Sequence, residues 1–132
     1  MRIYIAYKYR CIVDKDKLIK DLGLISDALE AKGHEPFILG RDVHKWGCST
    51  KPAWITIPHI FTNIKKSDLV LAFIDCDVKS FGLPVEAVCA KLLNKKIILI
   101  IKKDLKEAFL RKSAAQVIEF ENLQDALDQL NV

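Results

Sequence analysis

The sequence has few of the features that mark a secreted, metal-binding or membrane protein. Its 4 cysteines, at positions 11, 48, 76 and 89, are scattered and include no CxxC pair. A zinc site needs more closely paired ligands, and a disulfide framework is typical of small secreted chains. Apolar runs such as residues 97–101 are of strand length, far below the ~20 residues of a membrane span. We therefore expect reduced thiols, no bound metal and no membrane segment.

The N-terminus and the charge balance also limit the location and the ligands of the protein. Met1 and Arg2 lead directly into a β-like run, without the basic, apolar and small-residue segments of a secretory signal, so we expect a cytoplasmic protein. The net charge is +4 and the lysines are dispersed. This pattern is typical of a solvated surface rather than of the basic stripe that binds a nucleic-acid polymer. A free mononucleotide, which is also anionic, fits the charge equally well.

Strands and helices alternate along a chain of single-domain length, 132 residues. Apolar runs predict strands at residues 2–7, 36–39, 68–75, 96–102 and, more weakly, 117–120. Helical spacing or capping residues predict helices at 16–32, 84–94, 105–112 and 122–130, and a short helix near Ile60 and Ile64. This alternation predicts an α/β fold, a doubly wound five-stranded parallel sheet of the Rossmann or flavodoxin-like kind in one domain, 1–132.

The polar stretch 40–58 has no sustained periodicity and is long for a connection, which favours a functional or mobile loop. It contains Trp46 and Trp54, which either stack on a base or sugar or form a small local core. His44 is a weaker ligand candidate, because a lone histidine more often has no binding role.

In doubly wound sheets, ligands bind beyond the carboxyl ends of the strands, so the loops after the first and third strands are the candidate sites. In the first loop, Lys8 and Arg10 are candidate phosphate ligands, although basic residues are common in any loop. The loop has neither the glycine pattern of a dinucleotide site nor the ending of a P-loop.

The second loop leads into a helix whose first turn contains Glu86. Gly82 permits close backbone approach, and Pro84 suits the start of a helix. The helix dipole favours a carboxylate in the first turn, so Glu86 is predicted to be ionised near neutral pH. Such a carboxylate suits a nucleophile or a ligand of ribose hydroxyls; alternatively, Glu86 simply occupies an exposed first turn, as acidic residues often do.

Three segments together resemble the nucleoside 2-deoxyribosyltransferase family, nearest its 2′-deoxynucleoside 5′-monophosphate N-glycosidases. They are IYIA at 3–6, SDLVLA at 67–72, and the element Ser80-x-Gly82-x-Pro84-x-Glu86-Ala87. The similarity extends from the first strand to about Lys102. The third segment is moderately specific, because it follows the expected strand and opens the expected helix.

The resemblance implies a role for several residues. Glu86 matches the nucleophile that attacks the anomeric carbon, and Tyr4 matches the tyrosine that orients it. Arg10 and Ser80, with Lys8 adjacent, match positions that hold the 5′-phosphate. Ser113 corresponds to a serine donated by a neighbouring subunit, which implies a homodimer or a higher homo-oligomer. The implied reaction needs no cofactor, and the substrate is a small nucleoside or nucleotide.

The sequence departs from the family pattern at two positions. An acid in the helix before the third strand, which acts on the leaving base, aligns with Ile60, and neighbouring His59 is a candidate substitute, although a lone histidine in such a helix is more often structural. The glycine that usually follows the first strand in the family is replaced by Tyr7 in this sequence. Two functions therefore stay open: an N-glycosidase or deoxyribosyltransferase acting on a nucleoside or its 5′-monophosphate, or a non-catalytic nucleotide-binding or sensor module on the same fold.

Overall fold

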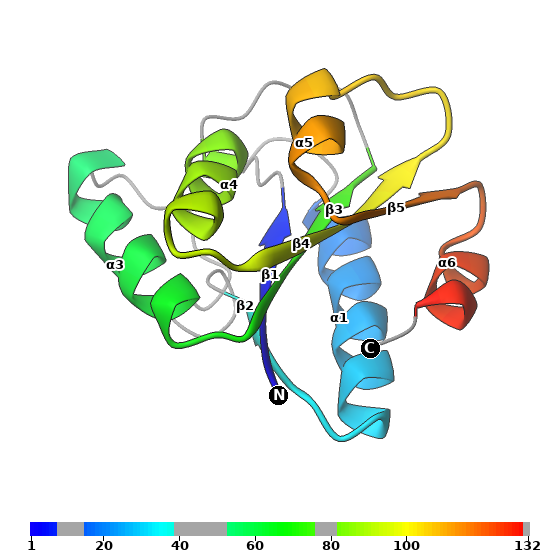
Figure 1. The fold of residues 1–132 in the computed structure, drawn as a ribbon. Helices are drawn as coiled ribbons and strands as arrows, with labels where there is room; N and C mark the ends of the chain where they lie inside the picture. The colour runs from blue at the N-terminus through cyan, green and yellow to red at the C-terminus, as the bar shows by residue number, and fades with distance from the viewer. Residues whose placement is uncertain (8–14, 39–52, 76–81, 131–132) are drawn as a thin grey trace.

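A computed structural model describes residues 1–7, 15–38, 53–75 and 82–130. Five parallel strands form one sheet in the order β2-β1-β3-β4-β5. The strands are β1 (Arg2–Tyr7), β2 (Glu35–Ile38), β3 (Leu69–Ile74), β4 (Lys96–Lys102) and β5 (Gln116–Phe120). The chain passes from β1 to β2 on one side and then returns to β3 on the other side of β1, so strand order reverses at β1 and β3. The predicted α/β fold with a five-stranded parallel sheet is confirmed (Figure 1).

Helices cover both faces of this sheet. The helices are α1 (Lys15–Ala31), α3 (Ala53–Lys65), α4 (Gly82–Leu92), α5 (Ala108–Ser113) and α6 (Leu123–Gln129). Helices α1 and α6 share one buried cluster with the sheet, and α3, α4 and α5 share the other. Figure 1 shows the same two helical layers on opposite sides of the strands. None of the described helices is long and apolar enough to cross a membrane.

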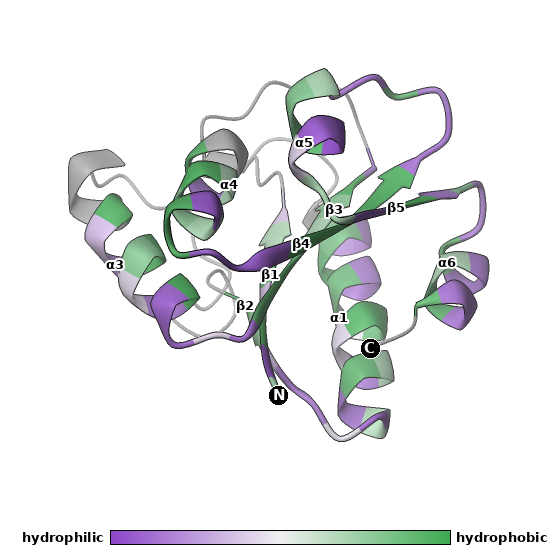
Figure 2. Ribbon diagram, in the orientation of Figure 1, coloured by the Kyte–Doolittle hydropathy of each residue, from purple (hydrophilic) through white to green (hydrophobic). Residues whose placement is uncertain are grey.

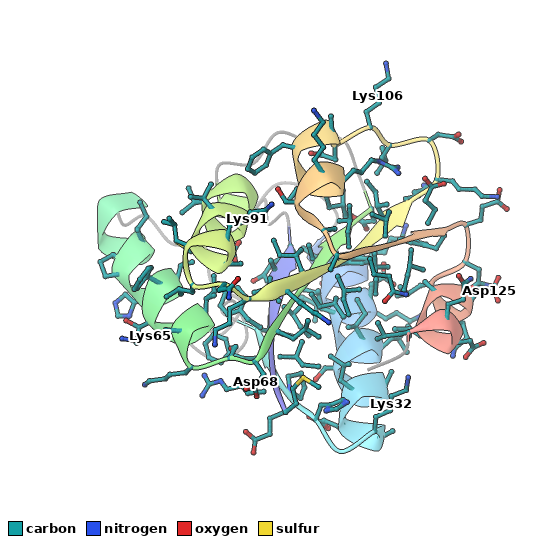
Figure 3. All side chains as sticks on the ribbon, in the orientation of Figure 1. Lys32, Lys65, Asp68, Lys91, Lys106 and Asp125 are labelled. Carbon is teal, nitrogen blue, oxygen red and sulfur yellow. The ribbon has the colours of Figure 1, made fainter. Side chains whose placement is uncertain are left out.

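Successive residues of each strand enter opposite clusters. In β1, Ile3 and Ile5 pack with α1 and α6, whereas Tyr4 and Ala6 pack under α3 and α4. Because both faces are covered, strands read as almost continuous apolar runs, and Figure 2 shows them as the hydrophobic centre of the fold. Charged side chains such as the labelled Lys106 and Asp125 lie at the periphery (Figure 3).

Helix α3 extends further than the sequence predicted. It begins at Ala53, inside the stretch expected to be irregular, and contains Pro58. A proline at an interior position removes a helical hydrogen bond and commonly marks a boundary. Here Ile60 and Ile64 are buried against the sheet, and burial of such side chains stabilises by roughly 1.5–3 kcal/mol each, enough to offset the proline. Residues 40–52 lie outside the described part of the chain.

Helix α5 is shorter than predicted, because it begins at Ala108 rather than at residue 105. Asp104 and Glu107 have φ angles of 72° and 40°, in the left-handed region, which ends any regular helix. The Arg111 guanidinium holds this segment by donating to the carbonyl oxygens of Leu105 (2.6 Å) and Lys106 (2.7 Å). The loop between β4 and α5 is therefore a fixed, non-helical connection.

Candidate active site

Tyr4 occupies the middle of β1 and points into the layer beneath α3 and α4. Its side chain is fully buried, and its ring lies 5.7 Å from that of Phe37 in β2, measured between centroids. In the sheet register it is paired with Phe37 on one side and Val70 of β3 on the other. The position is therefore rigid, since strands flank it on both sides.

Glu86 reaches the same layer from α4. It is 8% exposed and is one of the buried polar residues among those the structure describes. The buried face of α4 otherwise consists of small residues, Ala87, Cys89 and Ala90, which allow the helix to lie close to the sheet. Glu86 therefore lies against the core, and the alternative that it occupies an exposed first turn is wrong.

Burial, not the helix dipole, controls the protonation of Glu86. Desolvation raises the pKa of this carboxyl from its ordinary 4.5 to about 8, and the Tyr4 hydroxyl acts in the opposite direction. The prediction of an ionised carboxylate near neutral pH is therefore wrong: the group is mostly protonated at pH 7. The helix begins at Gly82 rather than at the predicted Pro84, so Glu86 is its fifth residue and lies beyond the first turn. Even in the first turn the dipole contributes only about 0.3–1 kcal/mol, whereas burying an unpaired charge costs far more.

The Tyr4 hydroxyl interacts with the Glu86 carboxyl. Burial, together with the Glu86 carboxylate, raises the pKa of Tyr4 strongly, so the phenol stays neutral. The hydroxyl oxygen is buried and has no partner within ordinary hydrogen-bond distance and angle limits, although it is close enough to lower the pKa of Glu86. The contact is therefore a close approach of two polar groups rather than a formed hydrogen bond. An unsatisfied buried donor costs about 1–3 kcal/mol. A bound ligand that accepts a hydrogen bond from the Tyr4 hydroxyl would remove this cost.

The predicted phosphate ligands Lys8, Arg10 and Ser80 lie outside the described residues, as do Trp46 and His44. Gly82 is the first residue of α4, so the Ser80-x-Gly82 segment leads directly into the helix that carries Glu86. The motif that resembles the family is therefore preceded by a strand, β3, and leads into a helix, α4, as predicted.

His59 and Ile60 have different surroundings on α3. The His59 side chain is exposed, whereas Ile60 is 5% exposed and belongs to the cluster that contains Tyr4. The residue that aligns with the acid of the family is thus an apolar side chain packed in the same layer as the Tyr4–Glu86 pair.

Ser113 is the last residue of α5, beside β4, since the amide of Ala115 donates to the carbonyl of Ile97 at 2.8 Å. Tyr4 lies in β1, on the far side of β3 from β4. Within one chain, Ser113 and Tyr4 are therefore separated by the width of β3.

Cys89 is a residue of this site that the sequence reasoning did not select. It is free and buried, and the Glu86 carboxylate raises the pKa of its thiol, after the larger effect of burial. Its spacing of three residues from Glu86 puts both on one face of a helix, a signal visible in the sequence. Among the described residues, no group of three His, Cys, Asp or Glu side chains gathers as a metal site.

Several solved structures have a fold similar to that of this chain. No protein-family model and no curated protein matches the chain. The CMP N-glycosidase BcmB of Clostridium botulinum superposes with a TM-score of 0.70 at 22% identity, covering 98% of this chain and 96% of that one. The 2-deoxyribosyltransferase of Bacillus psychrosaccharolyticus gives 0.73 at 18% identity, with 97% and 91% covered. A conserved protein from Enterococcus faecalis V583 gives 0.68 at 15%, with 97% and 95% covered. The chain thus has the flavodoxin-like fold of these proteins, and they include both enzyme classes named by the motif resemblance.

Proposed function

We propose that the protein cleaves the N-glycosidic bond of a nucleoside or a nucleoside 5′-monophosphate, with Glu86 as nucleophile. The observation that carries this proposal is the Glu86 carboxyl, buried beside the unsatisfied Tyr4 hydroxyl. Glu86 belongs to the helix that follows β3, and Tyr4 to β1, the two strands at which strand order reverses. The likeness in fold to an N-glycosidase and a deoxyribosyltransferase supports it.

The chemistry requires Glu86 to lose its proton first. The carboxylate then attacks the anomeric carbon, the bond from that carbon to the base breaks, and the base leaves with the bonding electrons and takes up a proton. Water, or a second base, later displaces the glutamate from the sugar. The neutral Tyr4 hydroxyl is a donor that orients the carboxylate. A carboxylate in a desolvated site also stabilises an oxocarbenium-like transition state.

A substrate panel tests the proposal. Purified protein is incubated with nucleosides and their 5′-monophosphates, and free base is followed by chromatography. We expect base release from at least one class and a loss of roughly 10³-fold or more in Glu86→Gln. Glu30→Gln, which changes an exposed glutamate of α1, is the matched control. No base release across the panel, or full activity of Glu86→Gln, would contradict the proposal.

The phosphate-binding group is part of the same proposal. Lys8, Arg10 and Ser80, with the Gly82 backbone, hold the 5′-phosphate, while Trp46 and His59 contact the base or sugar. We expect Arg10→Ala to raise KM for monophosphates by about tenfold or more and to leave KM for nucleosides nearly unchanged. An equal rise for both substrate classes would assign Arg10 another role.

We also propose a homodimer or a higher homo-oligomer in which Ser113 completes the site of a neighbouring copy. Exposed apolar side chains on the helical layer above the site, including Ile57, Phe61 and Phe109, support such an assembly. Light scattering at the assay concentration measures the oligomer, and a strictly monomeric active protein would exclude this role of Ser113. The free thiol of Cys89 supports a cytoplasmic location.

Non-catalytic nucleotide binding is the second candidate, and Ile60 favours it. An apolar side chain packed near Tyr4 cannot donate a proton to a leaving base. Calorimetry would then give saturable binding of a mononucleotide without base release, and absence of binding would reject this function. Ile60→Asp separates the two candidates, because a gain of base release in that variant would mean that a proton donor was the missing element.

A further inference from the structure

Helix α4 carries a second buried titratable side chain three residues after Glu86. Cys89 follows Glu86 by three residues and is 6% exposed, so both side chains belong to the buried face of the helix. Val88, next to Cys89, is 45% exposed and Leu92 is 75% exposed on the opposite face. The thiol therefore belongs to the buried layer over the sheet that also contains Tyr4.

The three groups interact with one another. The Glu86 carboxylate raises the pKa of the Cys89 thiol. Glu86, then Tyr7 and, with the smallest effect, Cys89 raise the pKa of the Tyr4 hydroxyl. Tyr4 is the only described side chain of the sheet or of α3 and α5 that acts on Glu86. Because each of these acids is anionic when ionised, a charge on Glu86 keeps both the phenol and the thiol in their neutral, proton-donating forms.

We propose that Cys89 is a positioning residue whose thiol, together with the Tyr4 hydroxyl, holds the carboxylate of Glu86. The Tyr4 hydroxyl is buried without a hydrogen-bond partner, so it is available to donate to Glu86. A carboxylate accepts hydrogen bonds only, so loss of the proton lets both O–H and S–H donate to it. The contact is independent of the reaction, but its catalytic consequence rests on the proposed function. In the proposed reaction, Cys89 favours the ionised form of Glu86, which is the nucleophile.

Carbon-13 NMR of the glutamate side-chain carboxyl tests the contact without any substrate. The Glu86 signal is assigned by its loss in Glu86→Gln, and its chemical shift is followed against pH in the whole protein. We expect Cys89→Ala to raise the midpoint by roughly half a pH unit or more, since a donor to the charged form is lost. Cys89→Ser keeps a donor and should return the midpoint to the wild-type value or below. Val88→Ala, on the exposed side of the same turn, should leave it unchanged.

An equal titration midpoint of Glu86 in the wild type, Cys89→Ala and Cys89→Ser would overturn the inference, because it would mean that the thiol does not act on the carboxylate. If Cys89→Ala fails to fold, a midpoint in Cys89→Ser more than half a unit above the wild type overturns it, and one at or below the wild type supports it. The substrate panel is scored separately. Ordered midpoints without base release would leave the contact standing and reject the proposed function, whereas base release with identical midpoints would do the reverse.

Discussion

The buried carboxyl of Glu86 should make the protein less stable as the pH rises. The pKa of Glu86 is about 8 in the folded protein against an ordinary 4.5, the value expected when the chain is unfolded. Between these two pH values the folded state keeps a proton that the unfolded state has lost, so raising the pH favours unfolding. The stabilising contribution is complete below about pH 4.5 and is lost as the pH rises through about 8.

The size of this effect follows from the same two values. A difference of one pKa unit corresponds to ~1.4 kcal/mol, so the interval from 4.5 to about 8 corresponds to an upper limit of roughly 5 kcal/mol. Water that reaches the carboxylate on opening of the site reduces this figure. Because small domains are stable by only about 5–15 kcal/mol, a change of this size is a large part of the total.

Urea unfolding of the wild type and Glu86→Gln, at closely spaced pH values from 4 to 9.5, measures the effect. Other titrating groups contribute equally to both proteins, so the difference in the free energy of unfolding isolates Glu86. We expect the wild type to lose several kcal/mol relative to Glu86→Gln across this range, most of it between pH 5 and 8. Glu30→Gln, on the exposed surface of α1, should show a flat difference. A flat difference for Glu86→Gln as well would refute the reasoning, since it would mean that the carboxyl titrates normally in the folded state.

Three further substitutions have defined consequences. Tyr4→Phe removes the hydroxyl that lowers the pKa of Glu86, so carboxyl NMR should give a higher midpoint, while the free energy of unfolding at pH 5 should rise by up to about 1–3 kcal/mol, because a buried hydroxyl without a partner is removed. Arg111→Met removes two carbonyl contacts and the 2.7 Å ion pair with Glu119, which should cost about 1–3 kcal/mol in urea unfolding; Glu119→Gln, which leaves the carbonyl contacts, should cost under ~1 kcal/mol. Asn122→Ala removes the side-chain cap of α6 and should cost about 1 kcal/mol, measurable as a lower midpoint of thermal unfolding.

The elements that the sequence predicted best are those whose signal is local. Strand β4 is a run of apolar residues between lysines, and its bounds match the prediction of residues 96–102. The helix predicted from residue 122 begins at a capping residue, since an asparagine side chain can accept from a backbone N–H two residues later, and Asn122 does so at 3.0 Å. Both features depend on a few adjacent residues, so the sequence alone contains them.

Features decided by contacts distant in the chain were missed. The sequence did not predict that α3 begins before Pro58. Burial of Ile60 and Ile64 against the sheet outweighs the local preference for a helix boundary at the proline. The start of α5 depends on Arg111, which holds the preceding loop from within the helix. The predicted protonation of Glu86 was wrong for the same reason: its position near the start of a helix is visible in the sequence, but its depth of burial is not.

Tyr4 and Glu86 are where stability and function conflict in this fold. If Glu86 served the fold alone, a cation would be expected beside it, because buried carboxylates are normally paired; instead, the group that lowers its pKa is a neutral phenol. The phenol itself is buried without a partner, which adds a second cost. An apolar pair at these positions would pack in the same layer as Ile60 and Ile64 with neither cost. Since strongly perturbed groups cluster at functional sites, the two unfavourable side chains together are better explained by a ligand or a reaction than by the requirements of the core.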